Sequence, residues 1–406
     1  MKHYIGLDIS NIETSICIVN ESGKIVKYMT ANSDPKDIEE KIRGTGLEVT
    51  AIGLETGPMS DWFTEKLRKC LHNKSEAGSG FWKVKLLNSF KMGRILEMNV
   101  NKHDPNDAFM VAEVTRIECF SGKFNLEVYC KSSESREIRS LIHIRQNNVG
   151  RLTSIYNEIR GSLKSFGITL PTATPKAFCG IVRNIIKDLS PIMKMVITAS
   201  LTIYEAINRE LEKLKMAIET MAEKNEDVQR LTKLDGVGSI LALYFVATIE
   251  DRNRFKNAKN IGAYFGLTPT QYASGETKIM KGISKRGDKT MRSLLFEAAT
   301  TVLYRAKKKT ELKIWGLKLE KKIGSKKARV GIARKLSIIM YQVFSTQKPY
   351  IEKAPKPKQT RCTYQFTTQE LENLLTESKK NGSISVKNIK QLKPLAVGCT
   401  EVVIKK

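Results

Sequence analysis

The chain has 406 residues, which is enough for two or three domains, and 41% of them are hydrophobic, which excludes a wholly disordered protein. The 69 Lys and Arg residues outnumber the 42 Asp and Glu residues, giving a formal net charge of +27. This excess favours nucleic acid as partner, because each neutralised phosphate releases counterions. A membrane surface is disfavoured, since the basic residues do not gather on one amphipathic helix. The alternative is a protein with a merely basic surface or a ribosome-associated one.

The seven cysteines include no CxxC pair, and the four histidines are scattered, which argues against a disulfide framework and against a zinc site. The N-terminal residues do not show the pattern of a signal peptide. The longest apolar runs, such as Ile240–Ile249, are shorter than the roughly 18 residues that a bilayer span needs. We therefore expect a cytoplasmic protein without a membrane span.

Residues 1–130 alternate strand-like and helix-like segments, which predicts an α/β domain with a mixed sheet. Apolar or alternating runs predict strands at Tyr4–Ile9, Thr14–Val19, Lys24–Tyr28, Val49–Leu54 and Val84–Leu87. Helical spacing predicts helices at Pro35–Arg43, Asp61–Leu71 and Asp104–Cys119. The turn-rich segment Asn20–Gly23 predicts that the second and third strands form a hairpin.

Residues 131–230 change character, because apolar side chains recur at helical spacing on both sides of the loop Thr169–Pro175. This pattern predicts a helical hairpin or an intermolecular coiled coil, and an ordinary helical bundle fits it equally well. Residues 231–345 predict a mainly α-helical domain with glycine-containing turns. Residues 346–406 predict a basic linker and a tail with one helical stretch, Thr368–Lys379, and two short strands, whose role the sequence does not indicate.

Four carboxylates form the first candidate site. Asp8 and Glu55 each end a predicted strand, and the carboxyl ends of strands are where ligands collect in open α/β sheets. Asp104 and Asp107 share one face at the start of a predicted helix. Four converging carboxylates would repel one another unless they held a divalent cation, and oxygen-only ligands select Mg²⁺ or Mn²⁺. Such ions can assist phosphoryl transfer.

Each acid also has a structural explanation. Asp104 can cap its helix ahead of Pro105, and Asp107 can be a favourable first-turn charge. Asp8 can open a phosphate-binding turn of the sugar-kinase type, although such a fold would not account for the basic charge. Taken together, two strand ends and one helix start favour the metal site over these separate explanations.

A second candidate site is basic and rich in glycine. Two glycines in Leu234–Ser239 predict a turn whose backbone N–H groups hold a phosphate, as in helix-hairpin-helix DNA binders. A basic pair precedes Gly287, and further basic residues surround Trp315. Solvated loops and helix faces are the alternative. We predict nucleic-acid contacts for Gly236, Gly238, Lys285, Arg286, Lys326, Lys327, Arg329 and Arg334.

Both candidate sites resemble segments of one family. Tyr4–Asp8, Ile52–Gly57 and Asn101–Ala108 resemble the DEDD signature of the RuvC-like transposases of the IS-one-ten insertion-sequence family, with His103 where that family usually has Thr or Ser. The run from Leu234 through Phe255–Pro269 and Gln271–Gly275 resembles the C-terminal transposase domain of the same family. The resemblance covers most of residues 1–345.

The resemblance implies a prokaryotic, nucleoid-associated transposase or recombinase of a mobile element. Residues 1–130 would form an RNase H-like, RuvC-like nuclease domain that binds Mg²⁺ through Asp8, Glu55, Asp104 and Asp107, and residues 231–345 would form the transposase domain. Ser274, which would otherwise be read as a turn residue, would be the nucleophile and form a phosphoserine–DNA intermediate. The implied partners are DNA, a structured bridge RNA and further copies of the chain, as a dimer or tetramer.

Two rival functions remain open at this point. One is a hydrolytic RuvC-like junction nuclease, which would use the four acids and water without a covalent intermediate. The other is a domesticated, non-catalytic nucleic-acid-binding protein.

Overall fold

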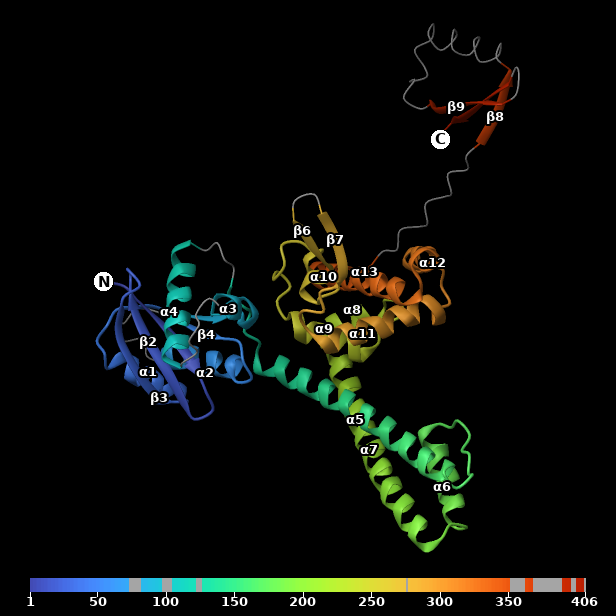
Figure 1. Ribbon diagram of the computed structural model, residues 1–406, viewed down its shortest axis with the longest axis horizontal. Helices are drawn as coiled ribbons and strands as arrows, with labels where there is room; N and C mark the ends of the chain where they lie inside the picture. Colours follow the sequence, from blue (N-terminus) through green and yellow to red (C-terminus); the bar gives the residue numbers. More distant parts are fainter. Residues whose placement is uncertain are drawn as a thin grey trace.

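The computed structural model describes residues 1–72, 82–96, 104–121, 126–274, 277–350, 362–367, 389–395 and 399–404. An N-terminal sheet domain is followed by a protruding helical hairpin and by a mainly helical domain that carries a β-hairpin (Figure 1). This confirms the predicted layout of a mixed α/β domain followed by a helical region. Across the described residues, every helix is too short or too polar to cross a bilayer.

The N-terminal domain contains a five-stranded sheet in the order β3-β2-β1-β4-β5. Its strands are β1 (His3–Ile9), β2 (Glu13–Asn20), β3 (Ile25–Asn32), β4 (Val49–Glu55) and β5 (Lys83–Leu87). The first three strands are antiparallel neighbours, whereas β4 runs parallel to both β1 and β5. The sheet is therefore mixed, as predicted.

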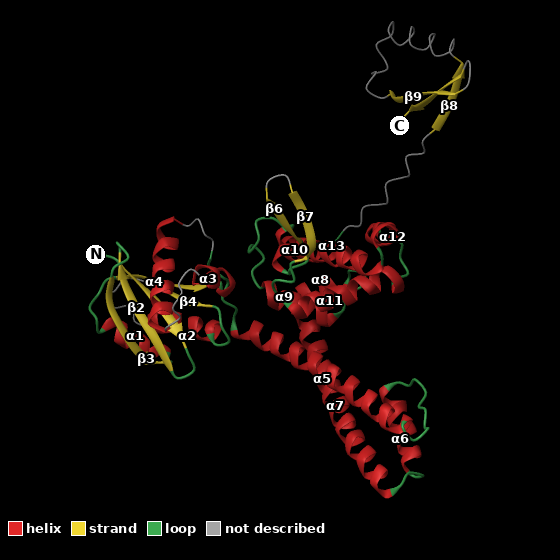
Figure 2. Ribbon diagram, viewed as in Figure 1, coloured by secondary structure: helices red, strands yellow, loops and turns green. Residues whose placement is uncertain are grey.

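Helices cover both faces of this sheet: α1 (Pro35–Arg43), α2 (Ser60–His72), α3 (Ser89–Leu96) and α4 (Asp104–Ser121). Successive strand residues point to opposite faces. On one face, Ile5 and Ile52 pack in a core with Ile38 of α1 and Phe63 of α2. The opposite face packs against α4 (Figure 2).

Helix α4 lies unusually close to the sheet, and two glycines allow this. A Cβ atom added to Gly6 would overlap the backbone of Ala108 and Ala112. One added to Gly53 would overlap the Thr115 hydroxyl group. The helix therefore rests on the backbone of β1 and β4 at positions where any side chain would push it away.

The protruding region consists of α5 (Ser133–Lys164), α6 (Pro175–Ile186) and α7 (Pro191–Lys224). Each begins at a Ser or Thr cap whose side chain accepts a hydrogen bond from a first-turn N–H group. Helices α5 and α7 are antiparallel, since Ile142 shares a core with Ile218, whereas Ile159 shares another core with Ile197 (Figure 1). The helical hairpin that the sequence predicted is thus present within one chain, and an intermolecular coiled coil stays a prediction.

The C-terminal helical domain contains α8 (Glu226–Thr232), α9 (Ser239–Ile249), α10 (Asn260–Tyr264), α11 (Lys289–Thr300), the π-helix η2 (Thr301–Arg305), α12 (Glu311–Ile323) and α13 (Ser325–Thr346). Helix α9 is its buried centre, with Phe245 packed against Phe265 and Phe344. Ile142 of α5 and Ile218 of α7 belong to the same core. The base of the helical hairpin is therefore built into this domain.

Two small sheets complete the described chain. The strands β6 (Pro269–Ser274) and β7 (Thr277–Ile283) form an antiparallel hairpin, which the prediction of a mainly helical domain did not include. In the tail, β8 (Cys362–Thr367), β9 (Ile389–Leu395) and β10 (Cys399–Ile404) form a sheet in the order β8-β10-β9. The predicted helical stretch Thr368–Lys379 lies outside the described residues.

The contact between α4 and the sheet gives a first prediction. Gly6→Ala should lower the free energy of unfolding by at least about 2 kcal/mol, because the added methyl group meets helix backbone that cannot rotate away. Gly93→Ala is the control: a Cβ there meets no atom of the described residues within 4 Å, so this helical position should gain about 0.5–1 kcal/mol. Chemical denaturation followed by circular dichroism measures both, and equal stability of the two variants would contradict the proposed contact.

Candidate nucleic-acid cleavage site

The strand ends place two of the predicted acids side by side. Strands β1 and β4 pair in parallel with Leu7 opposite Leu54, so Asp8 and Glu55 occupy neighbouring strand ends. Each acid lies two residues after a glycine that faces α4, and residues two apart share a face of a strand. Asp8 and Glu55 therefore point to the α4 side of the sheet, where both are half-buried.

Helix α4 brings the other two acids toward the same edge. Near its end, Phe120 packs on Tyr4 at the beginning of β1, with 5.7 Å between ring centroids. The helix thus runs opposite to β1, and its first turn lies toward the end of β1 that carries Asp8. Asp107 in this turn is half-buried. Asp104 begins the helix, but its side chain lies outside the described part of the structure.

The metal site itself stays a prediction. Among the side chains that the structure describes, no group of three or more His, Cys, Asp and Glu residues is arranged to hold a metal ion. The donor types at this edge are carboxylate oxygens, which fit Mg²⁺ or Mn²⁺ better than zinc.

The predicted nucleophile lies on the hairpin of the C-terminal domain. Ser274 ends β6 and pairs with Thr277 of β7, and its side chain lies outside the described part of the structure. The side chains of Gln271, Ile279 and Met280 are exposed, so the hairpin extends away from the domain core (Figure 1).

The two candidate sites approach each other in one chain through Arg286. Its guanidinium carbon lies 4.1 Å from the ring centroid of Phe90, on α3 of the N-terminal domain. The neighbouring Ser89 donates its backbone N–H group to the Thr56 hydroxyl at 3.0 Å, and Thr56 follows Glu55 directly. The turn that carries Lys285 and Arg286 thus contacts the sheet domain close to the edge that carries the acids.

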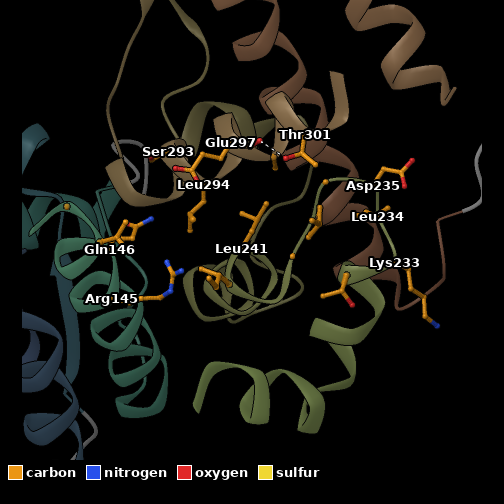
Figure 3. A pocket seen from close by; sticks show the side chains of 18 residues that line it. Arg145, Gln146, Lys233, Leu234, Asp235, Leu241, Ser293, Leu294, Glu297 and Thr301 are labelled. Atoms are coloured by element: carbon orange, nitrogen blue, oxygen red, sulfur yellow. Dashed lines mark hydrogen bonds between the residues drawn. The ribbon is translucent and has the colours of Figure 1, made fainter. Parts of the chain in front are cut away.

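The predicted Gly-x-Gly turn lines a cavity of about 1010 Å³ between α5, α9 and α11 (Figure 3). Gly236 has a φ of +81° and lies against the Ala298 carbonyl group, so this turn requires glycine. Gly238 is the N-cap residue of α9 and, as a glycine, has no side chain that could accept from the first-turn N–H groups. The first-turn N–H groups of a helix have no intrahelical acceptor, and Ile240 and Leu241 of this turn in α9 line the cavity.

Sequence reasoning missed Arg145 and Gln146, which α5 places on the same cavity (Figure 3). The Nε atom of Arg145 is buried and has no hydrogen-bond partner among the described residues. Asp235 and Glu297 also line the cavity and offset its positive charge. The helical spacing of α5 predicts which residues face its core, but only the packing of α5 on α9 shows that Arg145 meets the Gly-x-Gly turn.

The remaining predicted contacts differ in their exposure. Lys326 and Lys327 are exposed on the first turn of α13. Arg329 is half-buried, with its guanidinium carbon 4.6 Å from the ring centroid of Phe296. Arg334 is half-buried and packs against Gly262 of α10. The two lysines are open to a nucleic-acid backbone, whereas both arginines already contact the protein.

Comparisons with known proteins agree on one family. Residues 228–314 match the family model described as Transposase IS116/IS110/IS902 family. The chain is 32% identical over 256 residues to the transposase for insertion sequence element IS1111A of Coxiella burnetii, covering 62% of this chain and 68% of that protein. It is 25% identical over 255 residues to a probable family 20 transposase of Pseudomonas aeruginosa, covering 62% and 74%. It is 26% identical over 208 residues to the transposase for insertion sequence element IS1328 of Yersinia enterocolitica, covering 50% of this chain and 60% of that protein.

The cavity gives a second prediction. Arg145→Ala should weaken DNA binding about tenfold and lower the slope of log K against log salt concentration by about 1, because one phosphate contact is lost. Arg151→Ala is the matched control, since Arg151 is exposed on the same helix and does not line the cavity. Salt titrations of affinity by fluorescence anisotropy measure both, and an equal loss in the two variants would argue against a contact at the cavity.

Proposed function

The chain belongs to the IS116/IS110/IS902 family of transposases, and we propose that it cuts and rejoins DNA strands through a covalent serine–DNA intermediate. One observation carries this proposal: the Arg286 turn, at the base of the hairpin that bears Ser274, docks on α3 beside the acidic strand ends. The acidic strand ends and the β6–β7 hairpin that bears Ser274, called the serine hairpin below, are thereby brought near each other within one chain.

In this proposal the N-terminal domain is an RNase H-like nuclease. The mixed sheet, with Asp8 and Glu55 at adjacent strand ends and α4 across the same face, supports this assignment. The four acids, Asp8, Glu55, Asp104 and Asp107, would hold Mg²⁺, which supplies positive charge at the scissile phosphate. The carboxylates would act on the DNA backbone through this cation, because without it their negative charges would repel the phosphates.

The covalent step conserves the energy of the phosphodiester bond. The Ser274 hydroxyl loses its proton to a base and forms a bond to the scissile phosphorus. The phosphorus–oxygen bond to one DNA strand breaks, and the departing strand takes up a proton and leaves with a hydroxyl end. Attack by another strand's hydroxyl reverses these steps, releases serine and joins the new strand.

The partners in this proposal are DNA, a structured bridge RNA and further copies of the chain. The formal charge of +27 and the exposed Lys326 and Lys327 support nucleic-acid binding. Exposed apolar side chains along α7, among them Met195, Ile203 and Met216, support an association of protruding hairpins between chains.

The covalent step is tested by trapping adducts on DNA that contains an element end. Ser274→Ala should abolish strand cleavage, the protein–DNA adduct and joining, because the attacking oxygen is removed, and Asp8→Asn should abolish the same three products. Thr270→Val is the control. It removes a hydroxyl group from β6, the strand that also carries Ser274, and this hydroxyl donates to the Gly282 carbonyl group. Denaturing gel electrophoresis of labelled DNA measures all three products.

Two outcomes would reject the covalent proposal. Cleavage that needs Asp8 but yields no adduct and survives Ser274→Ala would indicate a hydrolytic nuclease. DNA binding without cleavage in Mg²⁺ or Mn²⁺ would indicate a non-catalytic binding protein.

The RNA partner is tested by purifying the protein from cells that carry its flanking DNA and by sequencing the RNA that accompanies it. We expect one structured RNA species, encoded next to the gene, to dominate. A mixture that follows the abundance of cellular RNAs would contradict guidance by a bridge RNA.

A further inference from the structure

The β6–β7 hairpin depends on its base for its position. A two-stranded hairpin alone is only marginally stable in water. The described side chains Gln271, Ile279, Met280 and Lys281 are exposed, so the outer part of the hairpin adds little packing. Whatever fixes the direction of the hairpin must therefore act where it joins the domain.

The base of the hairpin is a closely packed pair of backbone segments. Ser284 donates its N–H group to the Thr268 carbonyl at 2.9 Å, and Lys285 donates to the Gly266 carbonyl at 3.1 Å. Gly266 and Gly287 have φ values of +68° and +95°, and a Cβ on either would overlap the opposite segment. These contacts hold the two segments of the base together, and Asp288 attaches the base to α11.

Asp288 uses its two carboxylate oxygens for different tasks. Its Oδ1 caps α11 by accepting the Met291 N–H group at 2.9 Å. Its Oδ2 accepts the hydroxyl of Tyr244, on α9, at 2.8 Å and lies 2.9 Å from Nη1 of Arg139, on α5. A helix cap alone would need only the first contact.

The partners of Asp288 are themselves held in place. Tyr244 is buried, and burial together with the charge of Asp288 raises the pKa of its hydroxyl, which therefore remains a proton donor. Arg139 also binds the Thr248 hydroxyl at 2.9 Å and lies over the Tyr244 ring. Asp288 thus joins three helices at one half-buried point.

The same part of α5 is bound to the N-terminal domain. One turn before Arg139, Arg136 pairs with Glu65 of α2 at 2.7 Å. Lys131 donates its backbone N–H group to Asp61 of α2 at 3.2 Å. The start of α5 therefore connects α2, the helix that follows Glu55, to Asp288, the residue that follows the hairpin base.

We propose that Asp288 is a positioning residue, which fixes the direction of the serine hairpin relative to the acidic strand ends through Arg139 and α5. The inference rests on the proposed function for its catalytic meaning, although the mechanical link stands on the contacts alone. Asp288 touches no substrate in this proposal and acts through the hairpin base.

The test uses the full chain with Asp288→Asn. Asparagine keeps an oxygen to cap α11, so the fold should survive, but its amide group cannot accept from Arg139 and Tyr244. The matched control is Asp34→Asn, the same change at the cap of α1. Among the described contacts, the Asp34 side chain accepts only the Lys36 N–H group. Two quantities are measured: amide hydrogen exchange of residues 269–288 and the rate of adduct formation on element-end DNA.

We expect Asp288→Asn to speed exchange in the hairpin and its base about tenfold, since opening there no longer breaks the Asp288 contacts. The rate of adduct formation should fall about tenfold or more, because a small displacement of the nucleophile is costly. DNA affinity should stay within about twofold of wild type, and Asp34→Asn should match wild type in every measurement.

Unchanged exchange in Asp288→Asn would overturn the positioning proposal, as would an equal change in Asp34→Asn. So would faster exchange with an adduct rate equal to wild type. A wild-type protein that forms no adduct would refute the proposed serine chemistry instead, and the exchange measurement would still decide whether Asp288 fixes the hairpin.

Discussion

The close contact between α4 and the sheet is the constraint on which the candidate metal site depends. Gly6 and Gly53 let the helix rest on strand backbone, and this same face carries Asp8 and Glu55 two residues further along. The opposite direction of α4 then turns its acidic first turn toward the strand ends. The ends of β1 and β4 and the start of α4 lie about fifty residues apart in the sequence. They meet at one edge of the sheet because Gly6 and Gly53 have no side chain to hold α4 away.

A second constraint connects this edge to the helical domain. The segment that leads into α5 is bound on one side by Asp61 and Glu65, and on the other by Glu250, which accepts the Ser132 N–H group at 3.2 Å. Arg286 and Phe90 close a second contact between the domains. The two connections restrict how the sheet domain turns relative to the serine hairpin, which a recombinase with a divided active site would need.

Local signals predicted much of the fold. The helix Pro35–Arg43 is confirmed residue for residue, because Asp34 caps it, Pro35 starts it and Gly44 ends it. The β6–β7 hairpin was missed, since its glycines and polar residues resemble a loop and its sequence does not alternate regularly between apolar and polar residues. Arg145 and Asp288 were missed because their roles come from helices packed together over more than ninety residues of sequence. The acids could be proposed from spacing, whereas Ser274 could be proposed only from resemblance.

The most direct measurement identifies the residue that becomes linked to DNA. A protein–DNA adduct formed in Mg²⁺ on a nicked element end can be digested with protease and nuclease and sequenced by tandem mass spectrometry. The proposal predicts a nucleotide remnant on Ser274 and its absence from Asp8→Asn protein. A remnant on another residue such as Tyr272, or cleaved DNA with no modified peptide, would contradict it.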